Sequence, residues 1–221
     1  MSKHYSYVVF DLDGTLMNTY PGVAVSFTKT EQELGLRHLS DEELRSVIGP
    51  ALEDSFYRLY GLEGQDNQRA LDVFNRLYAT MEGAGNSPFY SGVADMLQAL
   101  KDRGCKISIA TMKPWIFTRI CLEAKGASSL FDSVACYQDN SGVSKAQLIL
   151  QTLQEMGGSP EETLMVGDTA SDGRGAAQAG VDFAAVTWGF GFHSRADLEG
   201  INYVGCFDRV EDLAHFVGDN H

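Results

Sequence analysis

Two aspartates, two positions apart, stand early in the chain where a run of apolar residues ends. Asp11 and Asp13 lie in the segment Phe-Asp-Leu-Asp-Gly-Thr-Leu at 10–16, directly after the apolar run 5–10. Residues two apart in an extended segment point to the same side, so both carboxylates can face one pocket. Close carboxylates repel, and a divalent cation or a shared proton relieves that repulsion. Taken alone, however, the pair favours a turn with solvent-exposed acids.

Four further polar positions follow apolar runs or begin helical patterns. Thr111 ends the run 107–110, Lys145 follows the capping residue Ser144, and Asp168 and Asp172 follow the run 163–166. Each of them has an ordinary structural role when it is taken singly. A threonine caps a helix or a turn, a lysine is solvated, and an acid favours the first turn of a helix.

Together these segments resemble the haloacid dehalogenase-like hydrolase superfamily. The segment 10–16 is similar to its first motif, and Thr111 fits the second, a Ser or Thr at the end of the next core strand. Lys145 fits the third motif, and Gly-Asp-Thr-Ala-Ser-Asp at 167–172 fits the fourth. The segment Val-Thr-Trp-Gly-Phe-Gly at 186–191 also resembles phosphoglycolate phosphatase-like members. Four matches in family order favour this family over the separate structural roles.

The resemblance implies a reaction through a covalent intermediate. Asp11 would attack phosphorus and form an aspartyl-phosphate, the covalent route that is open to a carboxylate. Asp13 would protonate the leaving oxygen and then deprotonate the hydrolytic water. Mg²⁺ would be held by the Asp11 carboxylate, the Asp13 backbone carbonyl and the Asp168 carboxylate, a set of hard oxygen ligands.

The remaining family positions imply phosphate contacts. Thr111, the ammonium of Lys145 and the backbone amides of Leu12, Asp13 and Met112 would hold the phosphoryl group. Asp172 would act through water or by orienting Lys145, and it can also serve as the N-terminal acid of its helix.

Two positions are left open by the sequence. Lys113 is a rival for the role of Lys145, because it follows Thr111 closely. Asn18 stands where family members often carry Asp, so its contribution to the site is also undecided.

The implied function is that of a Mg²⁺-dependent phosphoric monoester hydrolase acting on a small phosphorylated metabolite. Phosphoglycolate and nucleoside monophosphates are the leading substrates by resemblance. An acid two residues after the nucleophile is typical of phosphatases and phosphomutases, so a phosphomutase of the β-phosphoglucomutase type is the alternative. A binding or regulatory protein on an inactive scaffold is disfavoured, because all the catalytic residues of the family are present.

The elements that must position these residues alternate along the chain. Strands are predicted at 5–10, 107–110, 163–166 and 182–187, a weaker one at 133–136 and an edge strand at 201–204. Helices are predicted at 92–103, 144–156 and 172–179. This alternation predicts an α/β fold with a Rossmann-like parallel sheet covered on both faces.

The segment between the first strand and the rest of the sheet pattern lacks a convincing strand. A capping box at 40–43 and helical patterns at 51–60 and 66–81 indicate an inserted helical cap domain. We therefore predict a core domain at 1–18 and 87–221 and a cap domain at 19–86. The cap would exclude water and choose the leaving group.

Composition restricts the partners. A formal net charge of -13 and a pI of about 4.7 disfavour nucleic-acid backbones and anionic membrane surfaces. Four widely spaced cysteines give no zinc motif and indicate reduced thiols. No apolar run has the length of a signal peptide or a membrane span, so we expect a cytoplasmic protein that is a monomer or a homodimer.

Overall fold

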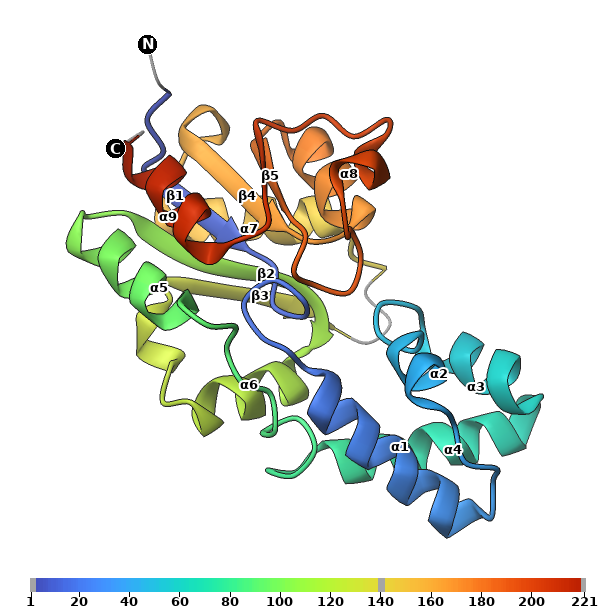
Figure 1. Cartoon of the computed structure of the whole chain (residues 1–221). Coiled ribbons are helices and arrows are strands. Elements are labelled where there is room, and N and C mark those ends of the chain that lie inside the picture. Colours follow the sequence, from blue (N-terminus) through green and yellow to red (C-terminus); the bar gives the residue numbers. More distant parts are fainter. Residues whose placement is uncertain (1–2, 139–141, 220–221) are drawn as a thin grey trace. The chain divides into compact units, whose positions relative to one another are not determined.

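The computed structural model describes residues 3–138 and 142–219, which form a parallel sheet with flanking helices and a separate helical unit (Figure 1). The strands are β1 (Tyr7–Phe10), β2 (Lys106–Pro114), β3 (Ser133–Tyr137), β4 (Thr163–Gly167), β5 (Asp182–Val186) and β6 (Gly205–Phe207). The α-helices are α1 (Tyr20–Leu34), α2 (Asp41–Arg45), α3 (Leu52–Tyr60), α4 (Gly64–Tyr78), α5 (Val93–Asp102), α6 (Trp115–Ala124), α7 (Lys145–Met156), α8 (Ala170–Ala179) and α9 (Val210–Asp219). Short 3-10 helices lie at Ser128–Leu130, Pro160–Glu162 and Arg195–Leu198.

The six strands form one sheet in the order β3-β2-β1-β4-β5-β6, and each neighbouring pair is parallel. The first strand therefore lies in the middle, between β2 and β4. Strand order reverses around β1, and such a switch point is where α/β sheets bind ligands, at the carboxyl ends of the strands. The predicted α/β fold with a Rossmann-like parallel sheet is confirmed.

Helices pack on the sheet because its residues are apolar on both faces. Helices α7 and α8 pack against each other, and the apolar core they form with the sheet includes Val9, Met165 and Phe183. Helix α5 packs against β2 and α9. Since side chains alternate along a strand, Val8 and Phe10 face away from Val9, and all three are fully buried.

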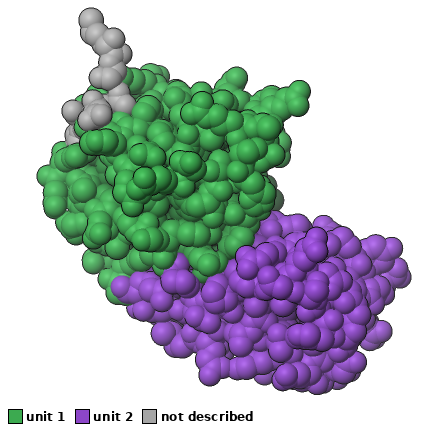
Figure 2. Space-filling view, in the orientation of Figure 1, with its two compact units in different colours: residues 1–18, 89–115, 126–221 green, residues 19–88, 116–125 purple. Residues whose placement is uncertain are grey.

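The chain divides into two compact units (Figure 2). Unit 1 comprises residues 1–18, 89–115 and 126–221, and unit 2 comprises 19–88 and 116–125. Unit 2 has its own aromatic core, in which Phe27 stacks on Phe56 with ring centroids 5.1 Å apart. The predicted cap segment 19–86 falls within unit 2, while its assignment as a domain stays a prediction.

Two stretches of the predicted core domain, residues 87–88 and 116–125, fall in unit 2 instead. Most of α6 belongs to that unit, because the Phe117 ring lies edge-on to Tyr78 with centroids 5.0 Å apart. The Cys121 thiol also donates to the Ala84 carbonyl oxygen at 3.1 Å. These contacts join residues far apart in sequence, so no local pattern could reveal them.

Some element bounds differ from the sequence prediction. The edge strand is Gly205–Phe207, and the predicted strand at 201–204 is wrong: Ile201 bonds back to Leu198 in a turn. Strand β2 continues to Pro114 through an irregularity after Thr111, where the sequence predicted its end at 110. Helix α8 begins at Ala170 rather than at 172, because Thr169 caps it.

Candidate active site

Asp11 and Asp13 follow β1 at the carboxyl edge of the sheet. The Asp11 amide donates to the Val166 carbonyl oxygen at 2.9 Å, which carries the ladder one residue beyond the strand. Gly14 then adopts φ 80°, a conformation that side-chain-bearing residues rarely take. The tight turn leaves Asp11 buried and Asp13 partly exposed.

Lys145 joins two of the predicted site carboxylates. Its ammonium lies 2.5 Å from Asp11 Oδ1 and 2.7 Å from Asp172 Oδ1, and all three side chains are almost fully buried. Helix α7 begins at this lysine because Ser144 closes a capping box with Gln147. The sequence therefore placed Lys145 correctly at the first position of a helix.

Asp172 contacts Lys145 and also lies in the first turn of its helix, the two positions that the sequence analysis considered for it. Its Oδ1 pairs with Lys145, whereas its Oδ2 accepts from the Thr169 amide at 3.0 Å and hydroxyl at 2.7 Å. The residue thus completes the capping box of α8 while it fixes the lysine ammonium.

Asp168 is held by groups that the sequence reasoning missed. Its Oδ1 accepts from the Thr15 hydroxyl at 3.1 Å. Its Oδ2 accepts from the backbone amides of Phe190 and Gly191 at 2.8 and 3.1 Å. A Cβ on Gly189 would lie 2.3 Å from the same Oδ2, so glycine lets the backbone wrap this carboxylate. In the sequence, the resemblance of 186–191 to a segment of a known family was the signal that could have pointed to these backbone donors.

Thr111 and Lys113 extend the site along β2. Thr111 is buried, and its hydroxyl accepts from the Lys113 amide at 3.2 Å. The Lys113 ammonium lies 2.9 and 3.1 Å from the two oxygens of Asp13. Lys113 and Lys145 therefore contact different carboxylates, and the two lysines are not rivals for one position.

A pocket of about 270 Å³ lies beside Lys145. Its lining includes Met112, one of the predicted phosphate-binding positions, together with the hydroxyl-bearing Ser144 and Ser171 and the guanidinium-bearing Arg174. The phosphate contacts predicted for the Leu12, Asp13 and Met112 amides stay predictions, as does any contribution of Asn18.

Two carboxylates of the site, Asp11 and Asp168, are costly to ionise. Burial raises the pKa of Asp11 to about 7; Lys145 opposes this shift, and the neighbouring aspartates add to it. Burial and Asp172 raise the pKa of Asp168 to about 6. Burial lowers the pKa of the Lys145 ammonium, but the ion pairs with Asp11 and Asp172 outweigh burial and raise the pKa overall. This group therefore stays charged.

The donor set fits a divalent cation. Oxygen atoms of Asp11, Asp168 and Asp172 lie within 4.8 Å of one another, and all three residues are buried. Counting Asp13, the site has four carboxylates and two ammonium groups, those of Lys113 and Lys145, which leaves two formal negative charges. Hard oxygen ligands with a net charge of this sign suit Mg²⁺. The buried aspartate cluster can therefore hold a metal ion.

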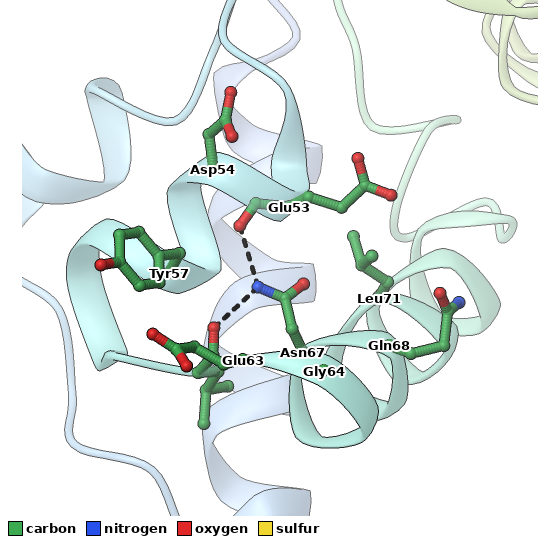
Figure 3. Close-up of a pocket in the computed structure, with 9 residues that line it drawn as sticks. Glu53, Asp54, Tyr57, Glu63, Gly64, Asn67, Gln68 and Leu71 are labelled. Atoms are coloured by element: carbon green, nitrogen blue, oxygen red, sulfur yellow. Dashed lines mark hydrogen bonds between the residues drawn. The ribbon is translucent and has the colours of Figure 1, made fainter.

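A second, larger pocket lies within unit 2 and has a different character. It measures about 470 Å³ and lies between α3 and the start of α4 (Figure 3). Asn67 fixes one wall by donating to the Glu53 and Leu62 carbonyl oxygens, both at 3.0 Å. Its described lining includes Glu53, Asp54 and Glu63 but no lysine or arginine, which makes it unsuitable for a phosphate group.

The fold and the cluster define an α/β enzyme with a buried carboxylate–lysine centre at the switch point of its sheet. Residues 8–186 match the family described as haloacid dehalogenase-like hydrolase, and the chain belongs to that family. The predicted family and enzyme class are thereby confirmed. Within residues 3–138 and 142–219, no helix has the length and apolar character to cross a membrane.

Named relatives cover most of the chain. It is 31% identical over 212 residues to tyrosine-protein kinase PtkA of Mycobacterium tuberculosis, covering 96% of this chain and 72% of the relative. It is 32% identical to pyrophosphatase PpaX of Bacillus cereus, covering 96% of each chain. It is 29% identical to phosphoglycolate phosphatase of Aquifex aeolicus, covering 83% and 85%. A haloacid dehalogenase-like hydrolase structure from Streptococcus pneumoniae superposes with a TM-score of 0.84 at 28% identity, covering 96% and 98%.

Proposed function

We propose that this chain is a Mg²⁺-dependent phosphoric monoester hydrolase that acts on a small phosphorylated metabolite through an aspartyl-phosphate at Asp11. The observation that carries the proposal is the convergence of Asp11, Asp168, Asp172 and Lys145 in one buried cluster. The relative named as a phosphoglycolate phosphatase supports the same reaction class, and the one named as a pyrophosphatase supports hydrolysis at phosphorus.

In the proposed first step, an Asp11 oxygen forms a bond to phosphorus while the bond from phosphorus to the ester oxygen breaks. The leaving oxygen takes its proton from the Asp13 carboxyl group. In the second step water attacks the same phosphorus, Asp13 takes the water proton, and the bond to Asp11 breaks. Alcohol and phosphate leave, and both aspartates return to their starting states.

The other residues hold charge in place. The Lys145 ammonium lies 2.5 Å from Asp11 and would neutralise phosphoryl oxygens at that position. The Asp11 and Asp168 carboxylates and the Asp13 carbonyl would hold Mg²⁺. When bound, the cation supplies positive charge that favours ionised carboxylates and stabilises negative charge on the transferring group.

The test is hydrolysis of p-nitrophenyl phosphate by the purified full-length chain, with Mg²⁺ and after chelation. We expect activity that requires the cation, and loss of activity in Asp11→Asn. A phosphoryl group that accumulates on Asp11 in Asp13→Asn, identified by peptide mass, would support the covalent route. A wild type without activity, or an active Asp11→Asn variant, refutes the proposal.

Substrate identity is a further part of the proposal. Phosphoglycolate and nucleoside monophosphates are the leading candidates, and a screen of phosphorylated metabolites that includes pyrophosphate tests them. The relative named as a kinase, 31% identical, makes ATP with a tyrosine peptide a necessary arm of the same screen. The phosphomutase alternative predicts glucose 6-phosphate from β-glucose 1-phosphate, so product analysis decides it.

A further inference from the structure

The lysine on β2 is directed at the acid/base aspartate rather than at the nucleophile. The Lys113 ammonium contacts both oxygens of Asp13, at 2.9 and 3.1 Å. The Lys113 side chain is 8% exposed and that of Asp13 25%. An ion pair at this depth is shielded from water on the lysine side and open on the aspartate side.

Local backbone structure holds the lysine in this direction. The Thr111 hydroxyl accepts the Lys113 amide at 3.2 Å, and the pairing of β2 with β3 shifts register between Thr111 and Pro114. Strand irregularities of this kind re-aim side chains next to active sites.

The two lysines therefore serve different aspartates. Lys145 contacts Asp11 and Asp172, whereas Lys113 contacts Asp13. An acid that donates its proton to a leaving oxygen must present one carboxyl oxygen to that atom and be held by the other. A buried ammonium beside Asp13 can hold one oxygen while the second carries the proton.

We propose that Lys113 is a positioning residue that fixes the Asp13 carboxyl group for proton delivery, which adapts the enzyme to substrates with poor, alkoxide leaving groups. This inference rests on the proposed function. In the acid step the proton moves from Asp13 to the ester oxygen as its bond to phosphorus breaks. In the second step the carboxylate, held by Lys113, takes a proton from the attacking water.

Leaving-group chemistry separates this role from a general structural one. A p-nitrophenolate ion departs without protonation, whereas an alkoxide requires it. In Lys113→Met we expect kcat/KM on glycerol 2-phosphate, which reports the steps up to formation of the aspartyl-phosphate, to fall about 100-fold or more, within the range for general acid catalysis. On p-nitrophenyl phosphate the loss of kcat/KM stays below about tenfold. Lys113→Arg, which keeps the charge, should restore part of the loss.

Matched variants complete the experiment. Lys101→Met is the control, because its ammonium is also partly buried in unit 1 but donates to the Leu130 carbonyl oxygen at 2.9 Å. Its kinetics should equal those of wild type on both substrates. In an Asp13→Asn background, Lys113→Met should cause no further loss, because residues that act as a unit are non-additive.

The outcomes are distinguishable. Equal losses of kcat/KM on both substrates, or a further loss in the Asp13→Asn background, overturn the positioning role while leaving the proposed function intact. A wild type inactive on both substrates overturns the proposed function and this inference with it. If Lys113→Met does not fold, Lys113→Gln replaces it, because glutamine keeps a hydrogen-bond donor without the charge. The same comparison of losses on glycerol 2-phosphate and p-nitrophenyl phosphate then tests the proposal.

Discussion

Replacing the nucleophile should stabilise the metal-free protein while abolishing hydrolysis. Asp11 is buried beside Asp168 and Asp172, and its pKa rises to about 7 from an ordinary value near 3.8. At about 1.4 kcal/mol per pKa unit, ionised Asp11 lowers folding stability by about 4 kcal/mol. Asp11→Asn removes that charge and keeps nearly the same shape.

The sign of the pH dependence follows from linkage. The folded state binds the Asp11 proton more tightly than the unfolded state does. Protonation of Asp11 therefore favours the folded state, and this contribution to the free energy of unfolding is fully present at low pH. It is lost as pH rises from about 4 to about 7. The advantage of Asp11→Asn should therefore grow from about 1 kcal/mol near pH 4.5 to about 4 kcal/mol above pH 7.

The assay is thermal unfolding followed by circular dichroism, with a chelator present. For a chain of this size, 4 kcal/mol corresponds to an increase in Tm on the order of 10 °C. Asp197→Asn is the control of opposite sign, because backbone amides of His193 and Ser194 lower the pKa of that exposed carboxyl group. An Asp11→Asn variant that melts below wild type at pH 8, or a difference independent of pH, would refute the reasoning.

Three further outcomes are expected. Gly189→Ala puts a Cβ 2.3 Å from Asp168 Oδ2 and from a backbone oxygen, so activity should fall at least about tenfold and the Mg²⁺ concentration for half-activity should rise. Ser144→Ala removes the α7 cap and should cost about 1 kcal/mol in urea unfolding. Gly22→Ala places a Cβ 2.1 Å from the Gly83 carbonyl oxygen, so unit 2 should lose about 1–3 kcal/mol and be cleaved faster by proteases. Unchanged values in any of these measurements would contradict the contact concerned.

The sequence predicted those parts of the fold whose signals are local. Apolar runs located the buried strands, the Ser-x-x-Glu pattern located the capping box at Ser40, and Ser144 was located as a helix cap. The edge strand was misplaced because β6 has only three residues, all partly exposed, and carries little apolar pattern. Its pairing to β5 depends on the sheet, which no local window contains.

In the candidate site, too, the sequence predicted the residues within recognisable motifs but not the contacts between distant segments. The four motif carboxylates and Lys145 were identified from the resemblance to the ordered motifs of the family, and the structure brings Asp11, Asp168 and Asp172 together. The partners that orient them came from distant segments. Thr15 and the amides of Phe190 and Gly191 reach Asp168 only once β1, β4 and the loop after β5 are adjacent. Sequence order alone also could not say which lysine pairs with which aspartate.

The degree of burial differs between the aspartates in a way that fits their proposed roles. The Asp11 side chain is 10% exposed and that of Asp172 is 1% exposed, whereas 25% of the Asp13 side chain is exposed. A nucleophile benefits from exclusion of water, since electrostatic interactions strengthen as the local dielectric falls. A group that takes a proton from water in each cycle needs access to water. Asp11 and Asp13 differ in position by only two residues, and the chain turns directly after them at Gly14, where φ is 80°. A variant that buries Asp13 more deeply should therefore slow hydrolysis of the aspartyl-phosphate more than its formation, which a pre-steady-state burst would reveal.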